Sequence, residues 1–143
     1  MMEIPYIKLK DNARVPERAT EGSAGYDLCA CEDTALPPRG RAMIPTGIAA
    51  ALPNGYVGLI FGRSGLGVKH GVTMANGVGV IDSDYRGELN VALVNHSDIT
   101  YNIKSGDRVA QLLIMPVASV QFIPAESLEG TERGESGFGS TGR

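Results

Sequence analysis

The chain contains no long hydrophobic segment. Hydrophobic residues make up 43% of its 143 residues, but no apolar run approaches the roughly 18 residues that a membrane-spanning helix needs. We therefore expect neither a membrane partner nor an intrinsically disordered chain. The length is that of one domain, and it suffices to bury a core without disulfides or a structural metal.

Cysteine and histidine are scarce. Cys29 and Cys31 lie two residues apart on one side of a predicted strand, which disfavours a mutual disulfide and supplies only half a zinc site. His70 and His96 lack partners at metal-ligand spacing and are interpreted as surface or loop residues. Reduced, half-buried thiols and the lack of a signal peptide favour a cytoplasmic protein, with a nuclear or viral setting left open.

A surplus of basic residues is also missing. The chain has 13 lysines and arginines against 16 aspartates and glutamates, a formal net charge of −3. A broad nucleic-acid surface requires an excess of basic residues, so stable nucleic-acid binding is not expected. A small anion needs only a few local arginines, so this class of ligand stays open.

Glycine and proline are frequent, at 19 and 8 residues, and they indicate the fold class. In helix interiors they cost about 1 and 3 kcal/mol, so long helices are not expected. About ten short strand-like segments, such as 56–61 and 117–123, alternate with turn signals and predict an all-β sandwich or barrel. Residues 62–67 are too rich in glycine for regular structure, and a single helical turn can follow them.

The composition changes near the C-terminus. Residues 130–143 are rich in glycine, and Phe138 is almost the only apolar side chain among them. We expect a barrel domain over residues 1–129 and a flexible tail over residues 130–143 that stays mobile until something binds it. A disordered terminus without function is the alternative, and composition alone favours it.

Five segments interrupt the strand pattern with polar or glycine-rich residues. The first, residues 24–28, contains Asp27, which can be a turn cap or an outer ligand of a metal ion. In the second, Arg63 offers a planar fork to phosphate oxygens, Ser64 adds a hydroxyl donor, and Gly65 lets backbone N–H groups approach an anion. This second segment predicts phosphate binding.

The third segment runs from Asn76 to residue 87 and contains Gly79, Asp82 and Tyr85. Its backbone amides can close a flat pocket, its carboxylate can act in catalysis, and its tyrosine ring can lie against a sugar. A long hairpin with a polar tip is the alternative interpretation. In the fourth segment, Gln111 lies among apolar residues, and a buried amide needs either backbone partners or a ligand.

The fifth segment lies in the tail, where Arg133, Phe138, Ser140 and Thr141 offer a cation, an aromatic face and two hydroxyls. Residues 137–142 also match the dinucleotide-binding fingerprint of glycines. That motif requires a preceding strand and a following helix, and here the chain ends one residue later. We therefore reject a dinucleotide-binding site at these residues.

Together and in this order, the five segments resemble the five motifs of the trimeric dUTPase family, over residues 24–142. The resemblance implies a jelly-roll-like barrel of the β-clip type and a homotrimer that exchanges its C-terminal tails. Each active site then draws motifs from all three chains. The implied activity is that of a dUTP diphosphatase, which uses Mg²⁺ to cut dUTP into dUMP and pyrophosphate. This reaction limits uracil in DNA and supplies dUMP for thymidylate synthesis.

The resemblance also implies the catalytic residues. Asp82 resembles the carboxylate that positions the water for attack on the α-phosphate, and Asp27 resembles the residue that holds Mg²⁺ through a coordinated water. Gln111 resembles a catalytic contact to the phosphates. The remaining phosphate contacts implied by the second motif are Arg63, Ser64 and Gly65.

Recognition of the nucleoside follows from the third and fifth motifs. Asn76 and the strand with Gly79 resemble the segment whose backbone reads the uracil edge. Tyr85 resembles the ring that stacks on deoxyribose and leaves no room for a 2′-hydroxyl. Phe138 would cover the uracil. The tail residues expected to grip the terminal phosphates are Arg133, Gly139, Ser140 and Thr141.

Three positions depart from the family pattern. Gly62 stands where proline or alanine is usual, Gly67 replaces another small residue, and Ser136 replaces a glycine. None removes a reactive group, so we expect them to affect rate and not function. The sequence leaves open whether Arg108 contacts substrate or forms a structural salt bridge.

Two alternative functions use a related fold. A dCTP deaminase requires a catalytic glutamate where this chain has Ala92, which disfavours deamination. A nucleotide-sensing regulatory protein, either without catalysis or in addition to it, would keep the binding residues. Because the candidate catalytic side chains are all present, hydrolysis is the preferred interpretation.

Overall fold

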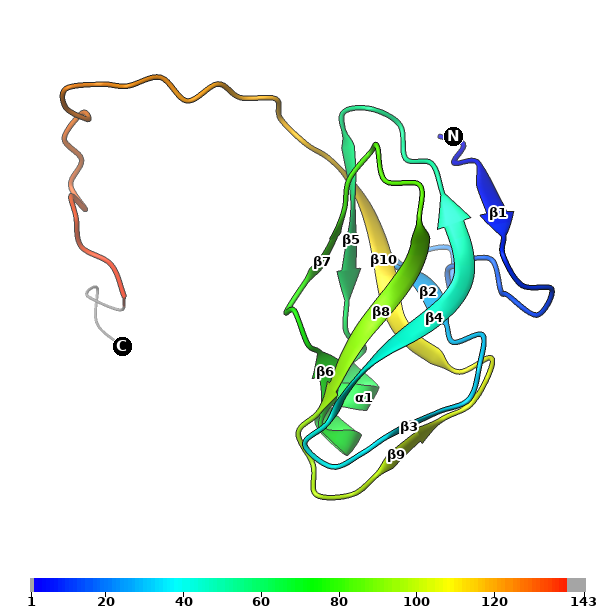
Figure 1. Ribbon diagram of the computed structural model, residues 1–143. Coiled ribbons are helices and arrows are strands. Elements are labelled where there is room, and N and C mark those ends of the chain that lie inside the picture. Colours follow the sequence, from blue (N-terminus) through cyan, green and yellow to red (C-terminus); the bar gives the residue numbers. More distant parts are fainter. Residues whose placement is uncertain (1, 139–143) are drawn as a thin grey trace.

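The computed structural model describes residues 2–138, which form ten strands and one short helix (Figure 1). This confirms the predicted all-β fold class. The strands are β1 (Tyr6–Lys8), β2 (Tyr26–Cys29), β3 (Thr34–Leu36), β4 (Arg41–Ala50), β5 (Tyr56–Phe61), β6 (Val72–Met74), β7 (Gly79–Ile81), β8 (Glu88–Asn95), β9 (Tyr101–Ile103) and β10 (Arg108–Pro116). The helix is α1 (Ser64–His70).

The strands form two four-stranded sheets and a small third sheet. One large sheet has the order β1-β4-β8-β6, the other has the order β2-β10-β5-β7, and β3 pairs with β9. Every registered strand pair is antiparallel. The β3–β9 pair lies at one end of the barrel, near α1 (Figure 1). This arrangement agrees with the expected jelly-roll-like barrel.

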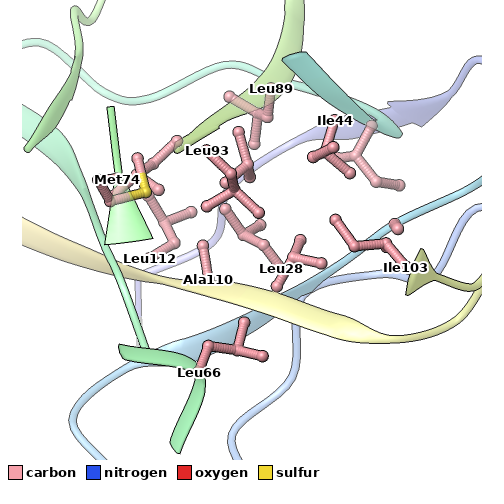
Figure 2. Close-up of a cluster of buried hydrophobic side chains, with 14 of the residues drawn as sticks. Leu28, Ile44, Leu66, Met74, Leu89, Leu93, Ile103, Ala110 and Leu112 are labelled. Carbon is pink, nitrogen blue, oxygen red and sulfur yellow. The ribbon is translucent and has the colours of Figure 1, made fainter. Parts of the chain in front are cut away.

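The core lies between the two large sheets (Figure 2). On β8, the alternate residues Leu89, Val91 and Leu93 are buried, as the period of two in a strand requires. Leu28 of β2 and Leu112 of β10 meet them from the other sheet. Each such side chain contributes about 1.5–3 kcal/mol when it leaves water. The opposite face of the second sheet stays available for polar residues.

The helix α1 corrects the expectation that residues 62–67 are irregular. Gly65 and Gly67 lie inside this helix, although each glycine costs a helix about 1 kcal/mol. Burial of Leu66 in the core offsets this cost, and Gly71 ends the helix in the left-handed conformation with φ 65°. Tertiary packing therefore overrides local propensity here. In the described range, α1 lacks the length and apolar character needed to cross a bilayer.

The predicted strand at residues 117–123 is absent from this single chain. The N–H of Val117 still donates to the carbonyl of Gly55, but the described residues beyond it form neither helix nor strand. This segment runs clear of the barrel (Figure 1), and Val120, Phe122 and Ile123 are exposed. A strand needs a neighbour for its backbone groups, and no other segment of the described chain supplies one.

Asn95 is a polar residue in the interior that ties β8 to the β3–β9 end of the barrel. Its side chain is fully buried. Its Nδ2 donates to the carbonyls of Leu36 at 3.2 Å and Ile99 at 2.7 Å. Its Oδ1 accepts from both the backbone N–H and the hydroxyl of Ser97. All the hydrogen-bonding groups of this amide are thus used.

Asn95→Ala should lower the free energy of unfolding by about 3 kcal/mol, because it leaves buried carbonyls without a donor and opens a cavity. The exposed Asn102 on β9 provides a control, and Asn102→Ala should change stability by less than about 0.5 kcal/mol. Urea unfolding at fixed protein concentration measures both. Equal effects of the two substitutions would contradict the bracing role of Asn95.

Candidate functional site

The candidate site begins with three side chains in a row across the outer face of the second sheet. Asp27 of β2 is the direct cross-strand partner of Gln111 of β10, which in turn pairs with Phe61 of β5. Directly opposed residues share one face of a sheet. Because the neighbouring Leu28 and Leu112 are buried in the core, this row faces outward.

A β-bulge adds Arg108 to the same face. Arg108 pairs with Cys29 and Ala110 pairs with Leu28, so Val109 is one extra residue on β10. Without the bulge, the odd spacing from position 108 to position 111 would place the arginine and Gln111 on opposite faces. The extra residue brings both side chains next to Asp27.

Asp27 is held between two arginines. Its Oδ1 lies 3.3 Å from Nε of Arg63, and its Oδ2 lies 3.2 Å from Nη1 of Arg108. Nη1 of Arg63 also donates to the backbone carbonyl of Arg108 at 3.3 Å. The Asp27 side chain is 18% exposed. In this chain, Arg108 therefore forms an ion pair within the candidate site.

The amide of Gln111 has a backbone partner. Its Nε2 donates to the carbonyl of Gly62 at 3.0 Å, and Gly25 lies against its other end. A Cβ at Gly25 would lie 2.7 Å from Oε1 of Gln111, which is too close for any side chain. Gly25 therefore sets the position of Gln111, a role that sequence patterns do not reveal because this glycine reads as a turn residue.

An open cavity of about 700 Å³ lies over this row, within the size range of small-molecule sites. It unites residues of the first, second and fourth motifs. Its apolar wall includes Phe61 and Leu113, which the sequence did not single out because they read as ordinary strand residues. The full lining is Ala19, Ser23, Ala24, Gly25, Asp27, Phe61, Gly62, Arg63, Ser64, Gly65, Gln111 and Leu113.

The residues of the third motif lie outside this cavity. Asn76, Gly79, Asp82 and Tyr85 are absent from the lining of this cavity. Gly79 belongs to β7, the last strand of its sheet, so one backbone edge of β7 faces away from the sheet. Asp82 is exposed, and no hydrogen bond or ion pair of its carboxylate occurs within residues 2–138. The single chain therefore separates this motif from the phosphate-binding candidates.

The described residues of the fifth motif also lie outside the cavity. Arg133 donates from Nε to the carbonyl of Ser136 at 2.8 Å, within a turn of the extended segment, and Phe138 is fully exposed. Figure 1 shows this segment away from the barrel. Gly139, Ser140 and Thr141 lie outside the described residues. The candidate residues within the described part of the chain thus fall into three groups that this single chain does not bring together.

Comparison with known proteins gives the family. Residues 11–142 match the dUTPase family. The chain belongs to the dUTPase family. A deoxyuridine 5'-triphosphate nucleotidohydrolase of Wolinella succinogenes is 46% identical over 142 residues, which cover 99% of this chain and 95% of the relative.

Solved structures of dUTPases share the fold. The dUTPase of Staphylococcus bacteriophage 80alpha, solved with dUpNHpp, has a TM-score of 0.93 and 33% identity, with both chains covered completely. A variant of the dUTPase from phage phi11 of S. aureus has a TM-score of 0.83 and 31% identity, covering 90% of this chain and 100% of the phage chain. That phage structure describes a structural Mg(II) ion.

Two departures from the dUTPase pattern have room for a side chain. A Cβ at Gly62 would meet no atom closer than 3.8 Å, and one at Gly67 would lie 3.6 Å from Cγ2 of Thr73. These are ordinary contacts, so close packing does not require glycine at either position. The structure offers no steric reason for these two glycines.

The two cysteines add no chemistry to the site. Cys29 and Cys31 are free, as expected from their spacing, but they are buried and not half-buried as predicted. Burial raises the pKa of both thiols above its usual value, so both are neutral at neutral pH and are poor nucleophiles. The described residues also contain no cluster of three or more His, Cys, Asp or Glu that could hold a metal ion.

Gly25→Ala should displace the Gln111 amide from the carbonyl of Gly62 and lower the free energy of unfolding by about 1–2 kcal/mol. Gly22 is a matched control, because a Cβ there would meet nothing within 4 Å and the residue is exposed. Urea unfolding at fixed concentration measures both variants. A Gly25→Ala protein as stable as Gly22→Ala would show that the contact with Gln111 does not constrain the site.

Proposed function

We propose that this chain hydrolyses dUTP to dUMP and pyrophosphate. The observation that carries the proposal is the cavity in which Arg63, Asp27 and Gln111 meet. It provides a cation and hydrogen-bond donors for phosphate beside a carboxylate for a metal ion. Membership of the dUTPase family supports the nucleotide. The cytoplasmic location expected from the sequence stays a prediction.

The phosphates would bind at the start of α1. Arg63 and Ser64 line the cavity, and a Cβ at Gly65 would meet nothing within 4 Å, so the space in front of this turn is open. Arg63 is 30% exposed and can exchange its contact with Asp27 for a bidentate contact with phosphate. Gln111 would donate to the same phosphates from the adjacent strand.

Mg²⁺ fits this site as a hydrated ion shared with the substrate. Asp27 offers one carboxylate, and Mg²⁺ commonly binds through one or two carboxylates, substrate phosphates and retained waters. An all-protein metal cage would need more ligands than the described residues gather. When bound, Mg²⁺ neutralises phosphate charge and orients the triphosphate. Asp27 would hold it through a coordinated water.

Asp82 would position and deprotonate the attacking water. Its exposed carboxylate is free to accept a proton as the water oxygen bonds to the α-phosphorus. The bond from that phosphorus to the bridging oxygen breaks, and pyrophosphate leaves with the electron pair. The proton then passes from Asp82 to solvent, so that atoms and charges balance.

We further propose that the complete site forms in a homotrimer. The three separated groups of motif residues can meet only when other subunits contribute to the site. The exposed Val120, Phe122 and Ile123 favour docking of the segment after β10 on a neighbouring subunit. β7 and Asn76 would read uracil through the free strand edge, and Tyr85 would stack on deoxyribose. The tail would bring Phe138 over the base. Its phosphate contacts would be Arg133, Gly139, Ser140 and Thr141.

An end-point assay tests the substrate. The protein is incubated with dUTP, dCTP, dTTP and UTP, with Mg²⁺ or with chelator, and the products are separated. We expect dUMP and pyrophosphate from dUTP alone, and only with Mg²⁺. A uracil nucleotide from dCTP would indicate a deaminase, and binding of dUTP without turnover would indicate a nucleotide sensor.

Asp82→Asn should reduce turnover of dUTP by at least about 10³-fold while binding of dUpNHpp stays within a few-fold, because the amide cannot accept the proton. Asp84, an exposed neighbour in the same turn, gives the control Asp84→Asn with unchanged turnover. Pyrophosphate release and calorimetric titration measure the two quantities. Near-normal turnover in Asp82→Asn would refute the assigned role.

Removal of residues 130–143 should leave a folded trimer with turnover lowered by at least about 10²-fold, because the tail would close the site and exclude water. Light scattering measures the assembly and pyrophosphate release measures the activity. The control is Ser136→Gly in the full chain, which restores the usual family residue and should change turnover by no more than a few-fold, because no reactive group is lost. A truncated protein with unchanged kinetics would exclude a lid.

A further inference from the structure

Gly87 lies against the hydroxyl end of the Tyr85 ring. A Cβ built at Gly87 would lie 2.6 Å from Cζ and 3.0 Å from Cε2 of Tyr85, and it would collide with the hydroxyl as well. Gly87 is not among the glycines with positive φ. The constraint at this position is therefore steric: the hydroxyl end of the Tyr85 ring occupies the volume that a Cβ would need, so a side chain at position 87 would displace the ring.

The Tyr85 ring is fixed in this position at its far end. Its hydroxyl donates to the carbonyl of Glu88 at 2.9 Å. Glu88 is itself anchored, because its Oε1 accepts from the N–H of Gly47 at 2.7 Å, in the bulge of β4. The acceptor of the tyrosine hydroxyl therefore belongs to the rigid pairing of β4 with β8.

The loop backbone is fixed around the same ring. The N–H of Tyr85 donates to the carbonyl of Asp82 at 3.1 Å. Nη1 of Arg86 donates to the carbonyls of Ser83 at 2.7 Å and Tyr85 at 2.9 Å. The backbone turn thus holds its shape through Arg86, while the orientation of the ring depends on the space over Gly87 and on the bond to Glu88.

We propose that Gly87 is a specificity-positioning residue, which keeps the Tyr85 ring at the angle that excludes a ribonucleotide. This inference rests on the proposed stacking of Tyr85 on deoxyribose. A methyl group at position 87 would lift the ring, break its bond to Glu88 and leave its face undefined. A ring displaced by about 1 Å or more no longer blocks a 2′-hydroxyl, and misplacements of this size cost up to about 10²-fold in rate.

The test compares kcat and KM for dUTP and UTP in Gly87→Ala, Tyr85→Ala, the double variant and Gly22→Ala. We expect Gly87→Ala to lower the selectivity for dUTP over UTP about tenfold, mainly through a lower KM for UTP, because the displaced ring no longer blocks the 2′-hydroxyl. Gly22→Ala adds a Cβ in open space and should behave as the parent protein. In the Tyr85→Ala background, Gly87→Ala should change selectivity no further, because no ring remains to be displaced.

The outcomes distinguish the stacking role of Tyr85 from the positioning role of Gly87. Unchanged selectivity in Tyr85→Ala would overturn the proposed stacking role itself. Reduced selectivity in Tyr85→Ala with parental selectivity in Gly87→Ala would overturn only the role of Gly87. Equal losses from Gly87→Ala with and without the tyrosine ring would also overturn it, because they would show a general effect on the fold.

Tyr85→Phe tests the same anchoring without any added atom. It keeps the ring and removes only the hydrogen bond to Glu88, so we expect a selectivity loss of about threefold with an unchanged melting temperature. This variant keeps the inference testable should Gly87→Ala fold poorly. Parental selectivity in Tyr85→Phe would show that the bond to Glu88 does not hold the ring in its working orientation.

Discussion

The antiparallel pairing of β10 with both β2 and β5 is the constraint on which the site depends. It sets the register that places Asp27, Gln111 and Phe61 in one row. The same strand supplies Ala110 and Leu112 to the core on its other face. Because a slip of one residue would exchange the two faces, burial of the core and alignment of the site enforce each other.

Much of the fold could be predicted from the sequence because its signals are local. The strand at residues 56–61 is predicted by its composition and the flanking turn signals, and its limits are confirmed by β5. Prediction from the sequence was wrong where long-range packing decides the structure. Burial of Leu66 makes α1 helical despite its glycines, and the segment at 117–123 has strand composition but finds no strand partner in its own chain.

The candidate site could be predicted in its chemistry but not in its geometry. Arg63, Asp27 and Gln111 are recognisable because charged and amide groups interrupt an apolar strand pattern. Their convergence depends on the bulge at Val109, and a single inserted residue leaves no distinct sign in composition. The ion pair of Arg108 with Asp27 depends on that bulge too, and for this reason the sequence left the role of Arg108 open.

The glycines illustrate why the positions of the side chains in the site cannot be predicted from the sequence. Gly55 and Gly77 have positive φ, and each follows an asparagine, a residue pair that indicates a turn. Gly25 and Gly87 look the same in the sequence, yet each leaves space for one side chain, Gln111 or Tyr85. The missing Cβ therefore acts through a partner far along the chain or across a loop. Polar side chains supply the chemistry of the candidate site, and the missing side chains at Gly25 and Gly87 leave the space that Gln111 and Tyr85 occupy.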